Sequence, residues 1–361
     1  MIDIRGRHHG SRLRFIGARL LRLGIGFFAA TLCYSAVVNK MMEVTVRGQI
    51  DEQLQAVMMG SGLTDPEERT ALRDRTRAAL ERSFGLDKPA WVRVARRSWD
   101  IVTLDLGDAR YESTGYPKRS SKVSDIILDR LPPTLIMFSL TTVISIALGL
   151  WIGRWMAARP GGRLDRAATS ITMVMFGTPT WWVASFMVLL FVYVVPVFRV
   201  GALHSPNLPD DALIRFLDYL SYLALPVLSL VLVKTWGIAF YTRAMTVVPM
   251  QEDYVMAARG RGLPEGKILR KHALRVAAPS ITTMAAQAFA QSICGDILVE
   301  QVMARPGIGW TLFAALRWND IPLITGILSV ITMIYVLTFA VMDILYAFLD
   351  PRIGYGSGNP G

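Results

Sequence analysis

Few residues in this chain have the type and spacing that catalysis or cofactor binding requires. Gly266 and Lys267 match the end of the phosphate-binding loop pattern, but Ile268 stands where that loop needs Ser or Thr, and no strand precedes it. No Ser, His and Asp set and no pair of carboxylates can be placed on facing elements. We therefore predict no ATP site, no metal site and no catalytic residue. The alternative of an intramembrane enzyme stays open, but no residue can be nominated as its nucleophile. The histidines, which lack the spacing of metal ligands, are His8, His9, His204 and His272.

The elements that could position a site are long apolar segments. The chain has 361 residues, of which 52% are hydrophobic and 19% charged, and its mean hydropathy is +0.38. This is too apolar for an ordinary soluble domain, so the charge must be segregated into loops. A membrane-spanning helix needs roughly 20 apolar residues. Six segments have that length, which predicts an all-α polytopic membrane protein with transmembrane helices over residues 15–38, 134–157, 168–198, 219–248, 278–299 and 322–349.

Basic residues gather on one side of these six segments. They crowd the N-terminus from Arg5 to Arg22, the loop from Arg154 to Arg166, and residues 249–275. The positive-inside rule therefore places both termini in the cytoplasm. Asp210, Asp211 and Asp218 then fall in an outer loop, and the long stretch 39–133 lies outside as well. The net charge of +11 is explained by membrane orientation and requires no nucleic acid.

Two other interpretations concern the N-terminus and the cysteines. The first apolar run has the basic start of a cleaved signal peptide, but it is longer than such a segment and no small-x-small cleavage site follows. We therefore expect a retained first transmembrane helix. Cys33 and Cys294 both fall at membrane depth, which favours free thiols over a disulfide framework.

Residues 249–275 form a polar interruption between two apolar segments. Helix-forming residues run to Arg259, Gly260 and Gly262 interrupt them, and Pro264 can open a second helix at its first turn. The sequence therefore predicts a helix, a glycine corner and another helix. The cations that this segment carries are Arg259, Arg261, Lys267, Arg270, Lys271 and Arg275.

The outer stretch 39–133 contains two predicted helices. The first starts at Thr64–Glu67 with a capping residue, a proline and an acid, and it extends to Phe84. The second opens after Leu86–Pro89. Its apolar stripe suits packing or the lipid interface, and we favour packing against the transmembrane helices over a ligand site. The stripe consists of Trp91, Val94, Ala95 and Trp99.

The C-terminal part combines charges with a rigid turn. Glu300 and Arg305 lie at the outer end of the fifth apolar segment, and Pro306, Gly307 and Gly309 form a tight turn. Asp343 lies inside the sixth segment, so it should face protein or water, and a salt-bridged structural role is favoured over a transport role. Asp350–Pro351 closes that segment.

Four stretches resemble the permease subunits of binding-protein-dependent ABC importers, in the di-/oligopeptide and nickel group. Ala257, Ala258, Gly262, Leu263, His272 and Leu274 resemble the loop by which these permeases dock onto their ATPase, although Met256 stands where Glu is usual and Leu274–Arg275 where Leu-Pro is usual. Residues 84–108 resemble the first outer loop of these permeases. Residues 298–309 and 343–353 resemble their last two transmembrane helices.

This resemblance implies an architecture and a set of partners. The fold would be that of a type I ABC importer permease, with a helical extracytoplasmic insertion after the first transmembrane helix. We divide the chain into residues 1–40, the cytoplasmic N-terminus and first transmembrane helix; 41–133, the extracytoplasmic helical segment; and 134–361, a five-helix core with an ATPase-docking loop at 249–275. The partners would be a homologous permease subunit, two cytosolic ATPase subunits that bind ATP and Mg²⁺, an extracytoplasmic solute-binding protein and the lipid bilayer of a prokaryotic inner membrane.

The same resemblance assigns roles. The chain would form half of a translocation path for peptides or similar small solutes, and it would not itself be an enzyme. The loop containing Glu300, Arg305, Pro306, Gly307 and Gly309 would contact the binding protein or act as a gate. Two alternatives stay open: an ion-coupled secondary transporter, for which Asp296 and Asp343 are the only deep acids, and a receptor or scaffold. Residues that could line the path, by polarity or aromaticity, are Trp181, Trp182, Lys234 and Gln287.

Overall fold

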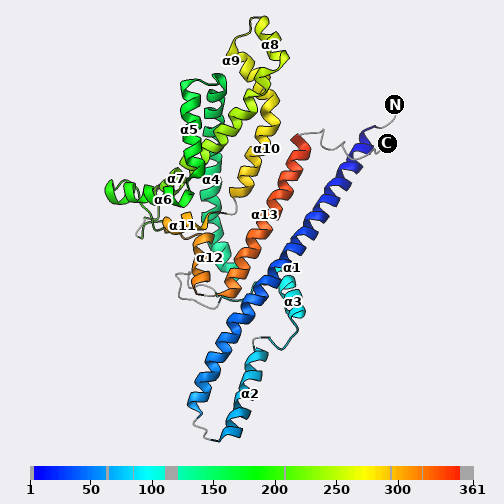
Figure 1. Ribbon diagram of the computed structural model, residues 1–361, viewed down its shortest axis with the longest axis vertical. Helices are drawn as coiled ribbons and strands as arrows, with labels where there is room; N and C mark the ends of the chain where they lie inside the picture. The colour runs from blue at the N-terminus through cyan, green and yellow to red at the C-terminus, as the bar shows by residue number, and fades with distance from the viewer. Residues whose placement is uncertain are drawn as a thin grey trace. The chain divides into compact units, whose positions relative to one another are not determined.

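The computed structural model describes residues 4–61, 65–83, 85–109, 121–206, 209–292, 295–318 and 320–349. Nearly every element in these ranges is a helix, so the all-α prediction is confirmed (Figure 1). The chain divides into two compact units. One comprises Met1–Ile126 with Trp318–Met333, and the other comprises Ile127–Arg317 with Ile334–Gly361.

The first unit is built on one long helix. Helix α1 (Ile4–Gly60) continues well past the apolar segment 15–38, so the predicted boundary at residues 40 and 41 lies inside a helix. Helix α2 (Pro66–Ser83) packs beside it. An Asp65 side-chain oxygen accepts a hydrogen bond of 3.1 Å from the Glu67 amide, which is the capping contact expected at this helix start. Thr64 and Phe84 lie outside the described residues.

Helix α3 (Ala90–Val102) also packs on α1, but not through the predicted stripe. Polar bonds join the two helices: Arg93 donates to Glu43 at 2.7 Å and to Asn39 at 3.1 Å. Trp91 and Trp99 point away, with 73% and 65% of their surface exposed. The expectation that these tryptophans pack within the chain is therefore wrong, because the arginine face of the helix occupies the contact with α1.

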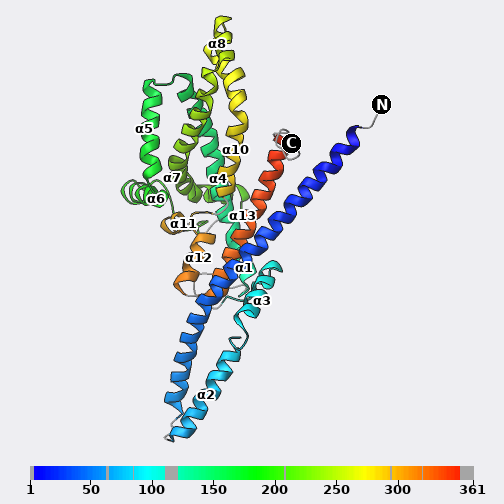
Figure 2. The ribbon, with the colours of Figure 1, turned by 45° about the vertical axis from the view of Figure 1, so that its right-hand side comes forward.

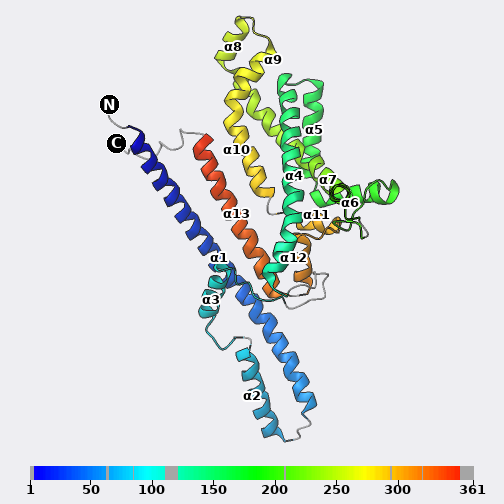
Figure 3. The same ribbon diagram turned by 180° about the vertical axis from the view of Figure 1, so that it is seen from behind.

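The second unit is a group of packed helices. Helix α4 (Val123–Ala158) crosses from one unit into the other, and it contains the predicted boundary at residue 133. Figures 1 and 3 show α4 and α5 (Arg163–Gly177) beside α7 (Ala212–Val247). A Cβ at Gly149 would lie 2.5 Å from an Ile238 side-chain atom, and one at Gly153 would lie 2.5 Å from the Ala239 carbonyl oxygen. Small residues thus let α4 and α7 approach closely, as in other membrane helix pairs.

The third predicted transmembrane segment, 168–198, is not one helix. Helix α5 ends at Gly177, and α6 (Thr180–Val188), continued by the π-helical turn η1 (Leu189–Val194), leaves at 97° (Figure 2). The cause is local, because Pro179 lacks an amide hydrogen and disfavours the helical conformation of the residue before it. Thr178 is accordingly extended, with ψ 123°.

The fifth predicted segment, 278–299, is also interrupted. Helix α10 (Leu274–Ser292) ends first, and α11 (Ile297–Val302) and α12 (Ile308–Arg317) follow as short helices. Gly295 adopts a φ of +71°, a conformation that glycine reaches without strain. Helix α13 (Ile321–Leu349) matches the sixth segment and contains Asp343. Cys294 and residues 350–353 lie outside the described residues.

Within the described ranges, three helices are long and apolar enough to cross a membrane, and the bent α5–α6 pair would make a fourth. The helices are α4, α7 with the short turn after it, and α13 up to Phe339. The prediction of six transmembrane helices therefore stays a prediction.

Candidate functional site

The segment 249–275, here called the basic hairpin, joins α7 to α10. It begins with the 3-10 turn η2 (Pro249–Gln251), continues with α8 (Asp253–Gly260) and α9 (Glu265–Ile268), and returns through the π-helical turn η3 (Leu269–Ala273). Figures 1 and 3 show α8 and α9 together at the end of α7 and α10. The predicted order of helix, corner and helix is present.

The corner of the basic hairpin is a Schellman cap. The Leu263 amide donates to the Ala258 carbonyl at 3.3 Å, and the Gly262 amide donates to the Arg259 carbonyl at 2.9 Å. This pair of bonds requires a left-handed backbone conformation at the residue just after the helix end. That residue is Gly262, which has a φ of +75°. A Cβ at Gly262 would meet no atom of the chain within 4 Å. A larger residue at Gly262 would therefore strain the backbone without clashing with other parts of the chain.

Apolar side chains hold the basic hairpin to the helices that carry it. Val255, Ala258 and Ile268 are fully buried in one cluster. This cluster also contains Ala157 of α4, and Val247 of α7 and Leu274 pack against it. The hairpin is therefore a packed extension of three long helices and not a flexible loop.

The outer surface of the basic hairpin is cationic. Arg259 pairs with Glu265 across the corner, with a nitrogen–oxygen distance of 2.7 Å. The hydrogen bond from Arg259 lowers the pKa of the Glu265 carboxyl, so this carboxylate stays charged at neutral pH. The remaining cations are exposed and make no ion pair with any other described residue: Arg261, Lys267, Arg270, Lys271 and Arg275.

The predicted docking residues fall on both sides of the basic hairpin. Ala258 is buried, and Leu263 and Leu274 are half-buried against the apolar cluster. Ala257 and Gly262 are exposed, and His272 is half-buried. Ala257, Gly262 and the cations are therefore accessible to a partner, whereas the leucines and Ala258 shape the hairpin.

A second group of polar contacts lies outside the basic hairpin. It is here called the Glu300 cluster and consists of the Glu300 and Thr134 side chains and the amides of Ile308 and Trp310. Glu300 is fully buried and accepts hydrogen bonds from the Thr134 hydroxyl at 2.7 Å and the Trp310 amide at 3.0 Å. The Thr134 oxygen in turn accepts from the Ile308 amide at 2.8 Å. A Cβ at Gly307 would lie 2.5 Å from both the Glu300 carboxylate and the Thr134 hydroxyl. The hydrogen bonds of the cluster therefore join α4, α11 and α12. Only glycine fits at position 307, because any side chain there would overlap the Glu300 and Thr134 side chains.

Arg305 is buried beside this cluster, with 2% of its surface exposed. It donates to the Tyr219 hydroxyl at 2.9 Å, and its guanidinium lies 5.2 Å from the centre of that ring. Glu300 and Arg305 are thus both buried within the chain, although the sequence places them at the end of an apolar segment. Pro306 is half-buried, while Gly307 and Gly309 are buried. The proposed contact of this turn with a binding protein stays a prediction.

The four predicted path residues do not form one group. Trp181 and Trp182 are 41% and 55% exposed on α6, and Trp182 stacks on Phe186. Lys234 lies on α7 and Gln287 on α10. No hydrogen bond or ring contact joins these four side chains in the described part of the chain.

Two polar contacts were missed because their members are far apart in sequence. Asp165, at the start of α5, is 3% exposed and pairs with Arg243 of α7 through both carboxylate oxygens, one of them at 2.7 Å. Thr134 holds Glu300 from 166 positions away. Only Asp165 had a local sequence signal, because an acid in the first turn of a helix is expected to bond to the backbone there. Its carboxylate also accepts a hydrogen bond from the Gly161 amide, just before the helix starts.

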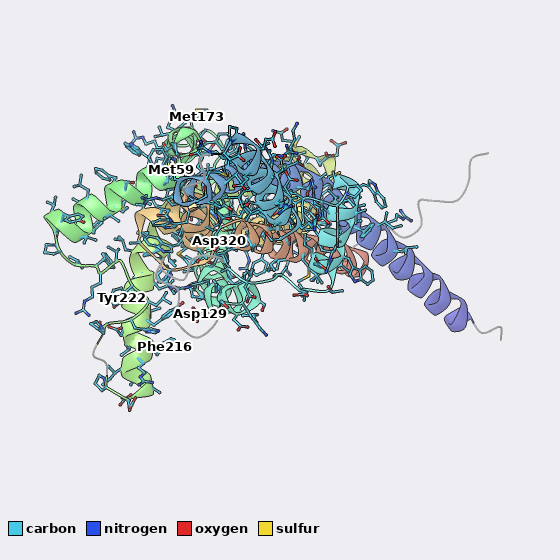
Figure 4. The ribbon with its side chains drawn as sticks, turned by 90° about the horizontal axis from the view of Figure 1, so that it is seen from below. Met59, Asp129, Met173, Phe216, Tyr222 and Asp320 are labelled. Carbon is cyan, nitrogen blue, oxygen red and sulfur yellow. The ribbon has the colours of Figure 1, made fainter. Side chains whose placement is uncertain are left out.

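The start of α7 carries another polar group, near Phe216 and Tyr222 in Figure 4. Asp218 accepts hydrogen bonds of 2.8 Å from the amide and hydroxyl of Ser205. This contact fixes the loop before α7, which the positive-inside rule predicts to lie on the outer side of the membrane.

Comparison with known proteins places the chain among transport proteins. Residues 149–355 match the family model described as "Binding-protein-dependent transport system inner membrane component". The chain is 30% identical over 276 residues to the "Putative peptide transport system permease protein" of Brucella abortus (strain 2308), covering 75% of this chain and 82% of the relative. It is 26% identical over 272 residues to the oligopeptide transport system permease protein AppB of Bacillus subtilis (strain 168), covering 75% and 83%.

Among solved structures, an inward-facing conformation of the MetNI methionine ABC transporter is similar. The match has a TM-score of 0.47 and 16% sequence identity, and it covers 62% of this chain and 95% of that chain.

Proposed function

Because this chain belongs to the family of binding-protein-dependent transport system inner membrane components, we propose that it forms half of a transmembrane path for peptides or similar small solutes. Membership makes the chain a permease subunit of an ATP-driven importer, in which ATP is hydrolysed by separate subunits. It also excludes the ion-coupled secondary transporter that the sequence alone had left open. Peptides are the solutes that the names of the related permeases support.

The proposed assembly has three kinds of protein partner. A homologous permease subunit supplies the other half of the path, two cytosolic ATPase subunits bind ATP and Mg²⁺, and an extracytoplasmic binding protein delivers the solute. The chain is a multi-pass membrane protein. Its placement in the inner membrane with both termini in the cytoplasm is part of the proposal, supported by the cationic surface of the basic hairpin.

The observation that carries the mechanism is the packing of the basic hairpin. Its buried cluster is continuous with Ala157 of α4, Val247 of α7 and Leu274 at the start of α10. A partner that moves the hairpin must therefore move the ends of these helices with it. ATP-driven closure of the ATPase subunits would thereby shift the path between inward- and outward-facing arrangements.

The test is reconstitution of the full complex. The permease pair, ATPase subunits and binding protein are placed in proteoliposomes, and uptake of labelled trialanine is measured with and without ATP. We expect ATP-dependent uptake that requires the binding protein. Uptake that continues without ATPase subunits, or retention of no ATPase subunit through purification, would contradict the proposal.

A further inference from the structure

Lys234 lies deep within a membrane helix. It is 13 residues from Val247, the last residue of the 36-residue α7. At a rise of about 1.5 Å per residue, this is about 20 Å from the end that carries the basic hairpin. A lysine side chain reaches the membrane surface only from near a helix end, so Lys234 cannot extend its ammonium to that surface.

The ammonium of Lys234 has no hydrogen-bond acceptor among the residues that the structure describes. Its Nζ lies 5.5 Å from the centre of the Phe138 ring, and no hydrogen bond or ion pair joins it to any other described residue. The Lys234 side chain is half-buried. A charged group in the membrane interior is costly, and such groups are ordinarily paired.

Asp296 is the acid that acts electrostatically on Lys234, and each of its oxygens accepts a hydrogen bond from another group. One accepts the Thr180 hydroxyl at 2.6 Å, and the other accepts the Val299 amide at 3.2 Å as the cap of α11. The carboxylate makes no hydrogen bond or ion pair with the Lys234 ammonium. It also ties the start of α6 to the break between α10 and α11.

We propose that Lys234 binds the carboxylate of the solute as it crosses the membrane. If the solute is a peptide, this group is its C-terminal carboxylate, so the inference rests on the proposed function and narrows its substrate class. A solute carboxylate supplies the missing acceptor, and a charge-assisted hydrogen bond is strong where water is scarce. Phe138, Thr180 and Asp296 hold the surroundings of the ammonium in place from α4, α6 and the start of α11.

The experiment uses the complete complex in proteoliposomes, with trialanine and trialanine amide as probes at concentrations that saturate the binding protein. Uptake and binding-protein-stimulated ATP hydrolysis are measured for wild type, Lys234→Met, Lys234→Arg and the control Lys40→Met, which removes an exposed cation from α1. We expect Lys234→Met to lower trialanine uptake about ten-fold or more. Amide uptake and stimulated hydrolysis should stay within two-fold of wild type, and Lys234→Arg should restore trialanine uptake.

The outcomes separate this inference from the proposed function. Unchanged trialanine uptake in Lys234→Met, or an equal fall for both probes together with ATP hydrolysis, would overturn the role of Lys234 while leaving the importer intact. If the wild-type complex imports neither probe with a loaded binding protein, the peptide function fails, and this inference fails with it.

Discussion

Two glycines of this chain are required for different physical reasons. Gly262 adopts a left-handed conformation in open space, so a side chain there would strain the backbone and touch nothing. Gly307 is buried without an unusual φ, and a Cβ there would enter the Glu300 cluster. The first therefore shapes a surface that a partner can reach, and the second closes an internal contact.

Substitution of Gly262 should impair coupling while leaving the protein folded. A β-branched residue in the left-handed region costs about 1–3 kcal/mol, which favours opening of the Schellman cap. We expect Gly262→Val to insert normally, to retain less ATPase subunit through purification, and to lose most ATP-driven uptake. Gly266→Ala is the control, because Gly266 is exposed and a Cβ there meets nothing within 4 Å. Normal ATPase retention and uptake in the valine variant would contradict the docking role.

Substitution of Gly307 should instead destabilise the protein. Overpacking a filled site typically costs about 1–3 kcal/mol. We expect Gly307→Ala to lower the midpoint of thermal unfolding in detergent, and Gly307→Val to lower it further. Gly237→Ala, on α7 with open space around it, is the matched control. If Gly307→Ala unfolds like wild type but loses stimulation by the binding protein, the turn acts in solute delivery and the structural explanation is wrong.

At the scale of elements, α3 turns its arginine face toward α1 and leaves its tryptophan face exposed. Its arginine face contacts α1 at Asn39 and Glu43, just beyond the predicted end of the first transmembrane helix. Trp91, Ala95 and Trp99 are exposed on the other face. Tryptophans are enriched at the boundary between lipid and water, so this face suits the membrane interface.

A spin label on α3 should detect lipid. In a cysteine-free background, Ala95→Cys places the label on the tryptophan face, and Arg69→Cys places it on the exposed surface of α2. We expect the label at residue 95 to be more accessible to oxygen, which concentrates in lipid, than to a water-soluble nickel chelate. The label at residue 69 should show the reverse. Equal chelate accessibility at both positions would place α3 in water.

At the scale of the whole molecule, the distribution of cations sets the expected orientation. The basic hairpin exposes five unpaired cations in the described part of the chain, whereas Asp210 and Asp211 precede α7 and Asp218 lies in its first turns. The positive-inside rule places the first in the cytoplasm and the second outside.

Single cysteines in a cysteine-free protein should report this orientation in intact cells. Ser61 and Asp210 are suitable outer positions. Asp210 is preferable to Ser205, because Asp210 pairs with Arg215 on the exposed surface, whereas the Ser205 hydroxyl bonds to the nearly buried Asp218. Cysteines there should react with an impermeant thiol reagent. Cysteines at Arg261, or at Ser357, which lies outside the described residues, should react only after permeabilisation. Labelling at residue 261 but not at 61 in intact cells would reverse the topology.

The sequence by itself determined the class of protein, most of its helices and its glycine corner. Apolar length, basic loops and turn residues are local properties, and local physics dictates the elements that they form. The kink at Pro179 has an equally local cause. Because membrane helices often tolerate proline, the sequence nevertheless predicted one continuous helix over residues 168–198.

Only the tertiary structure decided which polar groups are paired. Glu300 is satisfied by Thr134, and Asp165 by Arg243, across separations of 166 and 78 residues that no periodicity encodes. The same packing buries Arg305, turns the tryptophans of α3 outward and leaves Lys234 without an acceptor among the described residues. Sequence spacing fixes which side of a helix a residue lies on, but the neighbouring helix that meets it is set by packing of the whole chain.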